Sequence, residues 1–135
     1  MLRIFLGIFL ALHGLVHLWY FTLSQGLVEF KPEMGWSGRS WLFSPVLGGA
    51  TVRSLGSLLY AVATVAFVVG SLAFIARAGW AQALLAGAAL LSSLVIVLFW
   101  EGGLHMWAQK GLLGLLINVV LLLALWFARG WFAAI

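Results

Sequence analysis

The stretch from Ile4 to Leu23 constrains what this chain can fold into more than any other. It is twenty residues long and contains no Asp, Glu, Lys or Arg. A helix of that length rises ~30 Å, about the hydrocarbon thickness of a bilayer. It contains His13 and His17, and their spacing of four residues places both on one face. Imidazoles in a membrane segment are costly unless they face other helices or a wet cavity, so we expect the other helices to pack against this face.

The composition also indicates a membrane protein. Of the 135 residues, 65% are hydrophobic and 7% are charged, whereas soluble domains carry ~25% charged residues. The net charge of +4 comes from so few groups that it predicts no nucleic-acid surface, and it suits helix ends at anionic headgroups. The absence of cysteine excludes disulfides, thiolate metal sites and cysteine catalysis. The first apolar stretch is too long for a signal peptide, so we expect a retained helix.

The hydropathy pattern predicts an all-α fold, in which residues 1–135 form a single domain of four transmembrane helices. We expect these helices at about 4–23, 55–76, 80–100 and 112–127. One long interfacial loop, from Ser24 to Arg53, joins the first two helices, and loops of this length are typically lids or binding segments. Within it, Ser44-Pro45 favours the start of a short helix. The first half of the third helix consists largely of small residues and is expected at a helix–helix contact.

Four spans place both termini on one side of the membrane. Aromatic residues then gather at both interfaces, as membrane proteins favour. At the termini side they are Trp80, Trp126, Trp131 and Phe132, and at the far side they are Trp19, Tyr20, Trp36, Trp41, Trp100 and Trp107. The termini side also holds Arg3, Arg77 and Arg129 without an acid. Basic residues are almost evenly divided between the two sides, and Arg3 beside the amino terminus favours cytoplasmic termini. We therefore expect a multi-pass protein of the bacterial inner (cytoplasmic) membrane, in contact with the lipid bilayer.

The unusual polar residues fall in the half of the bundle away from the termini. Three imidazoles and one carboxylate suit zinc, manganese or non-haem iron. The candidate ligands of such a divalent metal ion are His13, His17, Glu101 and His105. We expect His17, Glu101 and His105 to converge, because the glycines after Glu101 let the chain fold back over the bundle.

A structural role accounts for the same residues. In it, His13 and His17 hydrogen-bond Asn118, serines or backbone carbonyls across the bundle, for about 0.6 to 2 kcal/mol each. Glu101 is then an interfacial carboxylate that faces water and pairs with Lys110 or Arg53.

The segment Trp36-Ser37-Gly38-Arg39-Ser40-Trp41 precedes the second predicted span. Two tryptophans around an arginine suit an anion or a lipid headgroup. The candidate ligand or headgroup residues are therefore Trp36, Arg39 and Trp41, together with Asn118 inside the last predicted helix. The alternative is an aromatic interfacial anchor with a snorkelling arginine. In both cases we expect Trp36 and Trp41 at the interface, covering the far end of the bundle.

Three features of the sequence together indicate a resemblance to other proteins. They are His13-Gly14-Leu15-Val16-His17, then Gly35-Trp36-Ser37-Gly38-Arg39-Ser40-Trp41-Leu42, and finally Ser92 to Trp100 with an acid after it and Asn118 in the last apolar span. With these, the chain resembles a group of uncharacterised small bacterial four-transmembrane-helix membrane proteins over most of its length. It is more loosely similar, in size and hydropathy, to small DoxX-type proteins. The resemblance implies an architecture and no activity.

Three function classes stay open. The first is a binding protein whose His/Glu site near one membrane face holds a metal ion or a small polar or lipidic ligand. The second is a structural or accessory subunit that packs against larger membrane partners or a second copy, with histidines serving helix contacts only. The third is a small membrane enzyme, which is disfavoured because the chain has only three acids, no cysteine and no recognised catalytic motif.

Overall fold

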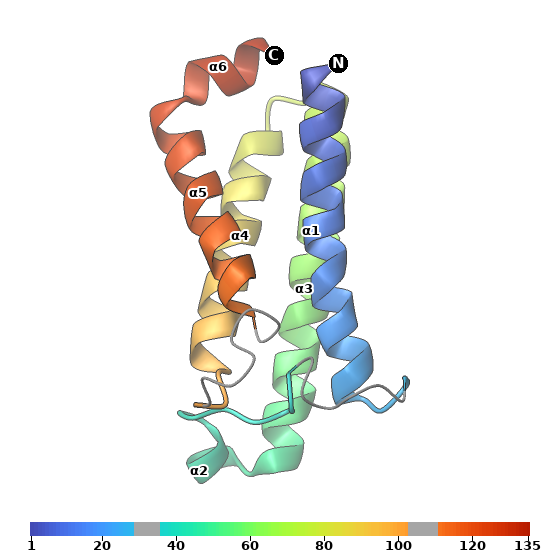
Figure 1. The fold of residues 1–135 in the computed structure, drawn as a ribbon, viewed down its shortest axis with the longest axis vertical. Helices are drawn as coiled ribbons and strands as arrows, with labels where there is room; N and C mark the ends of the chain where they lie inside the picture. The colour runs from blue at the N-terminus through green and yellow to red at the C-terminus, as the bar shows by residue number, and fades with distance from the viewer. Residues whose placement is uncertain (29–35, 103–110) are drawn as a thin grey trace.

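The chain folds into helices that run alongside one another (Figure 1). The computed structural model describes residues 1–28, 36–102 and 111–135. Its helices, in order, are α1 (Leu2–Ser24), α2 (Ser44–Leu47), α3 (Gly49–Ile75), α4 (Ala81–Leu98), α5 (Leu113–Phe127) and α6 (Arg129–Ala134). No strand occurs in these described ranges, so the all-α prediction is confirmed. Both termini lie at the same end of the helices, as expected (Figure 1).

Three of the helices are long and apolar enough to cross a membrane. They are α1, α3 and α4, with 23, 27 and 18 residues, whereas α5 is a shorter apolar helix of 15 residues. Large apolar side chains on these helices point outward, among them Phe5, Leu58, Leu94 and Leu116. An apolar surface of this extent suits lipid and not water. The helices therefore indicate a multi-pass membrane protein.

The predicted boundaries agree closely with the structure except at the start of α3. This helix begins at Gly49, so the prediction that its first turns up to Arg53 belong to the loop is wrong. Those turns are too polar to be recognised from hydropathy as part of an apolar span. The side chain of Val52 is fully buried and holds them against the other helices. The short helix at Ser44-Pro45 is confirmed as α2. Helix α6 was not predicted.

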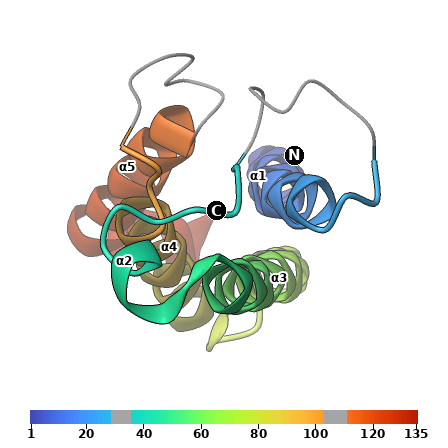
Figure 2. The same ribbon diagram turned by 90° about the horizontal axis from the view of Figure 1, so that it is seen from below.

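The helices pack in sequence order, α1 against α3, α3 against α4, and α4 against α5 (Figures 1 and 2). Close approach of α1 to α3 requires glycine at position 14, because a Cβ atom added to Gly14 would overlap the Cβ of Phe67. Such small residues let membrane helices pack tightly. On α4 the small-residue face is buried as predicted, at Ala81, Ala88 and Ala89.

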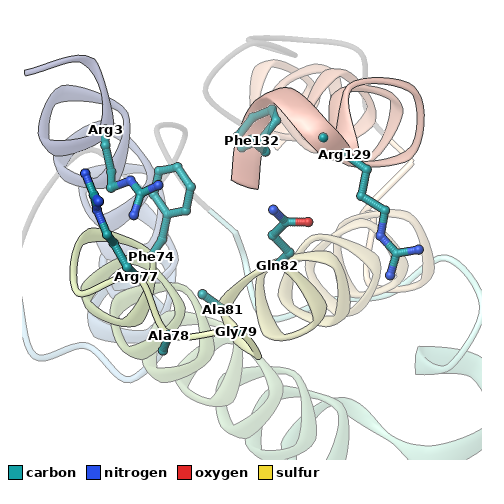
Figure 3. A pocket seen from close by; sticks show the side chains of 10 residues that line it. Arg3, Phe74, Arg77, Ala78, Gly79, Ala81, Gln82, Arg129 and Phe132 are labelled. Atoms are coloured by element: carbon teal, nitrogen blue, oxygen red, sulfur yellow. The ribbon is translucent and has the colours of Figure 1, made fainter. Parts of the chain in front are cut away.

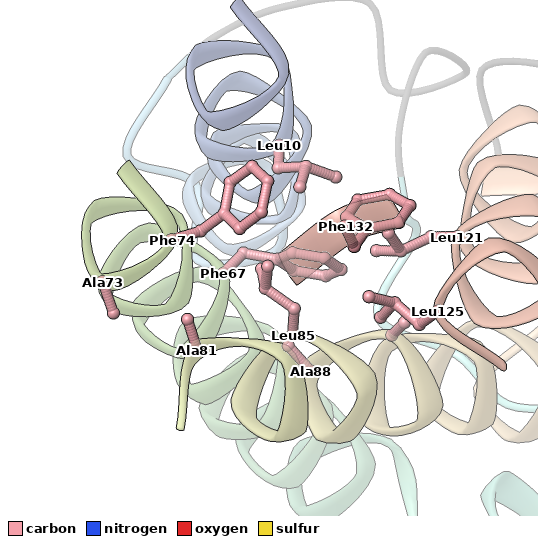
Figure 4. Packing of buried hydrophobic residues seen from close by; sticks show 11 residues of the cluster. Leu10, Phe67, Ala73, Phe74, Ala81, Leu85, Ala88, Leu121, Leu125 and Phe132 are labelled. Carbon is pink, nitrogen blue, oxygen red and sulfur yellow. The ribbon is translucent and has the colours of Figure 1, made fainter. Parts of the chain in front are cut away.

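Two hydrophobic clusters fill the interior. The first, towards the termini, is shown in Figure 4 and includes Leu10, Phe67, Leu85, Leu121 and Phe132. The second lies towards the far end and includes Tyr20, Trp36, Tyr60, Val95 and Phe99. On α1 the histidines fall between Leu10 and Tyr20, so they lie where the two clusters meet.

Three aromatic residues expected at the interfaces are buried instead. The exposed fractions are 6% for Phe132, 6% for Tyr20 and 7% for Trp36, so these rings pack inside the protein, and the depth of the aromatic residues in a membrane stays a prediction. Their rings fill space inside the bundle, where Phe132 contacts Phe74 at 5.8 Å between ring centroids. Aromatic residues that are exposed, which suits a position at an interface, include Trp41, Trp80, Trp126 and Trp131. Trp107 lies outside the described residues.

A buried polar network as the candidate functional site

The rings of His13 and His17 point into the bundle, as their spacing predicts. Their exposed fractions are 7% and 1%. The ring of His13 lies 5.0 Å from the ring of Phe67 on α3, and that of His17 lies 6.0 Å from the ring of Tyr60. Gly14, between the two histidines, lets α1 approach α3 closely enough for these contacts. The histidine face of α1 therefore packs against α3, and the hydrogen bonds described below connect it to α4 and α5 as well.

A continuous chain of hydrogen bonds connects the two histidines through α5 and α4. Nε2 of His13 lies 2.8 Å from Oδ1 of Asn118. Nδ2 of Asn118 donates to Oγ of Ser92 at 2.7 Å. Oγ of Ser92 in turn lies 2.5 Å from Nε2 of His17. The chain ends at Nδ1 of His17, which lies 3.2 Å from the backbone carbonyls of His13 and Gly14. We call these four side chains the polar network.

The backbone carbonyls determine the direction of every donor in the network. A carbonyl only accepts, so Nδ1 of His17 carries the hydrogen and Nε2 of the neutral ring accepts. The hydroxyl of Ser92 therefore donates to His17 and accepts from the amide of Asn118. The oxygen of Asn118 then accepts from Nε2–H of His13. The geometry thus assigns opposite tautomers to two histidines one helical turn apart.

The polar groups of the network are shielded from water, so their hydrogen bonds to one another favour the packed arrangement of the helices. Ser92 and Asn118 are fully buried, each with an exposed fraction of 0%. In a bilayer, polar groups without internal partners cost several kcal/mol. Since α1 packs mainly on α3, and α5 mainly on α4, the bond between His13 and Asn118 is a direct link between α1 and α5.

Aromatic rings separate the network from the far end of the bundle. The ring of His17 stacks on Phe67 at 5.8 Å and lies 6.4 Å from the ring of Tyr20. Beyond these, the indole of Trp36 lies 5.3 Å from the ring of Tyr60. The side of His17 that faces this end is therefore closed by aromatic packing.

The segment from Trp36 to Trp41 caps the carboxyl end of α4. The last carbonyls of a helix lack partners within it and need donors from elsewhere. The donors here are the indole N–H of Trp36, the hydroxyl of Ser40, and the indole and backbone N–H groups of Trp41. The indole of Trp36 donates to the carbonyl of Phe99 at 2.9 Å, and the hydroxyl of Ser40 donates to that of Leu98 at 2.6 Å. The indole of Trp41 donates to the carbonyl of Val97 at 2.9 Å, and its backbone N–H donates to that of Trp100 at 2.6 Å. The segment covers this end of the bundle, as expected for a lid (Figures 1 and 2).

The candidate headgroup residues in this segment have different surroundings. Trp36 is buried, and its indole also donates to the carbonyl of Arg39 at 2.7 Å. Trp41 has an exposed fraction of 55%, and Arg39 is exposed. The indole N–H groups thus bind the protein itself, and a headgroup role for the exposed side chains of Arg39 and Trp41 stays a prediction. Residues 29–35 of the long loop lie outside the described residues.

The structure separates the candidate metal ligands into different settings. His13 and His17 belong to the polar network, whereas Glu101 is half-buried beyond the end of α4. His105 lies outside the described residues. In the ranges 1–28, 36–102 and 111–135, no three His, Cys, Asp or Glu side chains are grouped so that they could hold a metal ion. The four-residue metal site, and the convergence of its members, stays a prediction.

Ser92 is the network member that the sequence did not single out as a site residue. Serines were among the expected partners of the histidines, but the sequence does not distinguish Ser92 from Ser93 next to it, because both are hydroxyl residues within an apolar helix. Ser93 instead bonds the carbonyl of Ala89 on its own helix, at 2.7 Å. Asn118 was singled out, as a candidate ligand residue and as a partner of the histidines, and the second role is the one that the hydrogen bonds match.

No family model, curated protein or solved structure matches this chain. The function therefore rests on the arrangement of its own residues.

Proposed function

We propose that this protein is a four-span structural or accessory component of the bacterial inner membrane, in which the histidines join helices. The observation that supports this most is that Nε2 of His13 and both nitrogens of His17 are used by hydrogen bonds within the chain. The expected binding partners are larger membrane proteins or a second copy of the chain. A transport function is disfavoured, because a bundle of this size leaves little room for a pathway.

The fourth span in this proposal is α5. Its 15 residues rise ~22 Å, which is short for a bilayer crossing. The exposed Trp126 at its end and the exposed Trp131 on the following α6 suit an interface. An even number of crossings fits the location of both termini at one end, and Arg3 there favours a cytoplasmic location.

The environment of His17 disfavours a catalytic role. A general base or a metal ligand needs a nitrogen lone pair directed at its substrate or metal. In His17 the lone pair of Nε2 accepts from Ser92, and Nδ1 donates to backbone carbonyls. A ligand would reach this ring only after the helices separate.

A metal site is the second candidate, because the rings of His13 and His17 lie 5.5 Å apart, which two ligands of one ion can do. Substitutions at His13 distinguish the two functions. We expect His13→Gln to keep most of the free energy of unfolding, because its amide N–H can donate to Asn118 as Nε2–H does. We expect His13→Leu to lose about 1–3 kcal/mol, because the oxygen of Asn118 then has no donor.

The measurement is unfolding in mixed detergent micelles, combined with elemental analysis of protein purified without chelator. Leu12→Ala is the control, since Leu12 is next to His13 in sequence but has an exposed fraction of 58%. We expect this control to cost less than His13→Leu. Stoichiometric zinc, manganese or iron in the wild type, lost in His13→Gln, would contradict the structural role and assign the metal function.

A further inference from the structure

A pocket of about 540 Å³ lies at the end of the bundle that holds both termini (Figure 3). Its polar lining consists of Arg3 from α1, Arg77 from the turn after α3, Gln82 from α4 and Arg129 from α6. In Figure 3, Arg3 and Arg77 lie on one side, Arg129 lies on the other, and the amide of Gln82 lies between them. None of the described lining residues is acidic. The pocket therefore concentrates positive charge from three separate elements.

Arg3 is held in place as part of the pocket wall. Its exposed fraction is 8%, and its guanidinium carbon lies 5.5 Å from the centroid of the Phe74 ring. A guanidinium stacked on an aromatic ring is restricted in orientation, and the N–H groups of a guanidinium bind carboxylate or phosphate oxygens in pairs. A fixed arginine of this kind suits the recognition of an oxyanion.

Arg77 provides an independent indication, from its backbone. Its φ angle is 63°, in the left-handed region that side chains other than glycine rarely adopt. The N–H of Ala78 donates to the carbonyl of Ala73 at 2.9 Å, and that of Arg77 to Phe74 at 3.2 Å. This is a Schellman motif, in which glycine usually takes the position of Arg77. A strained arginine that lines a pocket indicates a role for its side chain.

The surroundings of the pocket place it at the depth of lipid headgroups. Trp80, Trp126 and Trp131 belong to the same end and are exposed, with fractions of 54%, 80% and 48%. Exposed tryptophans of a membrane protein concentrate at the headgroup level. Phe74 and Phe132 also line the pocket, so apolar rings lie beside the arginines. A ligand with a phosphate and adjoining apolar groups matches this lining.

We propose that the pocket formed by Arg3, Arg77, Gln82 and Arg129 binds a phosphate group, and that an anionic phospholipid carries it. The bilayer brings such headgroups to this depth at high local concentration. This site is separate from the polar network, so its test does not depend on the role of the histidines.

The experiment measures lipid binding to the full chain in a neutral detergent by native mass spectrometry. The probes are dioctanoyl phosphatidylglycerol, dioctanoyl phosphatidylcholine and inorganic phosphate. We expect the wild type to bind phosphatidylglycerol more tightly than phosphatidylcholine. We expect Arg77→Gly and Arg129→Gln each to weaken phosphatidylglycerol binding about fivefold, the effect of one basic residue near a membrane surface. Arg53→Gln, at the exposed far end of the bundle, is the matched control and is expected to change nothing.

Two further results make the test decisive. Arg77→Gly removes the backbone strain, so we expect its melting temperature to equal or exceed that of the wild type, which excludes misfolding as the cause of weaker binding. Competition by millimolar inorganic phosphate, with the same dependence on arginine, would support the phosphate site and identify a free anion as its ligand. Equal binding of both lipids, or equal binding by the arginine variants and the control, would overturn the proposal.

Discussion

Asn118→Ala is expected to lower the free energy of unfolding by about 2–3 kcal/mol. The side chain of Asn118 makes two hydrogen bonds, to His13 on α1 and to Ser92 on α4. Hydrogen bonds between membrane helices contribute ~0.6 kcal/mol on average and up to ~1.7 kcal/mol. Alanine also leaves Nε2–H of His13 without its acceptor at a fully buried position, which adds a desolvation cost. The result should be a loosened contact between α5 and the rest of the bundle.

The measurement is again unfolding in mixed micelles, followed by tryptophan fluorescence. Val119→Ala is the matched control, because Val119 is the next residue of α5 and has an exposed fraction of 43%. We expect the control to cost less than about 1 kcal/mol, since its side chain is not part of the core. Equal losses in Asn118→Ala and Val119→Ala would mean that the polar network contributes nothing to stability.

Trp36→Ala is expected to have a still larger effect, a loss of about 3–5 kcal/mol in the free energy of unfolding. The indole of Trp36 packs 5.8 Å from the ring of Phe99 and 5.3 Å from that of Tyr60. It also lies against Gly56, where an added Cβ atom would overlap it. Alanine would therefore leave a cavity and also remove the donor to the carbonyl of Phe99 at the end of α4.

Two variants separate the packing of Trp36 from its hydrogen bonds. Trp36→Phe keeps an aromatic ring but lacks the N–H, so we expect an intermediate loss. Trp41→Ala removes one indole bond from a side chain with an exposed fraction of 55%, so we expect a loss of about 1 kcal/mol. A loss in Trp36→Ala no larger than that in Trp41→Ala would show that Trp36 is an interfacial anchor and not part of the core.

Much of the fold could be predicted from the sequence because the signals are local. An uninterrupted apolar stretch predicts a helix and its length, and a spacing of four residues predicts that His13 and His17 share a face. The burial of that face follows, since lipid offers an imidazole no hydrogen-bond partner. The start of α3 at Gly49 could not be predicted, because its first turns are polar and are held by the buried Val52.

Asn118, serines and backbone carbonyls were the expected partners of the histidines, but which serine is used required three-dimensional information. Ser92 and Ser93 look alike in the sequence, and only the rotation of α4 decides that Ser92 meets Asn118. Likewise, the tryptophans around Arg39 predicted an interfacial position for Trp36. Its burial depends on the close contact of its indole with Gly56, which only the structure shows. The arginines of the termini side were visible as a group, but the pocket between them depends on α6, which was not predicted.

The structural role of the polar network is tested most directly by the tautomeric state of its two histidines, measured by ¹⁵N solid-state NMR of the protein in lipid bilayers. We expect His13 to carry its hydrogen on Nε2 and His17 on Nδ1, because the backbone carbonyls beside Nδ1 of His17 set the direction of the whole network. His17→Leu assigns the resonances. A His17 ring protonated on Nε2, or two rings that exchange between tautomers, would contradict the conclusion that the network holds the helices together.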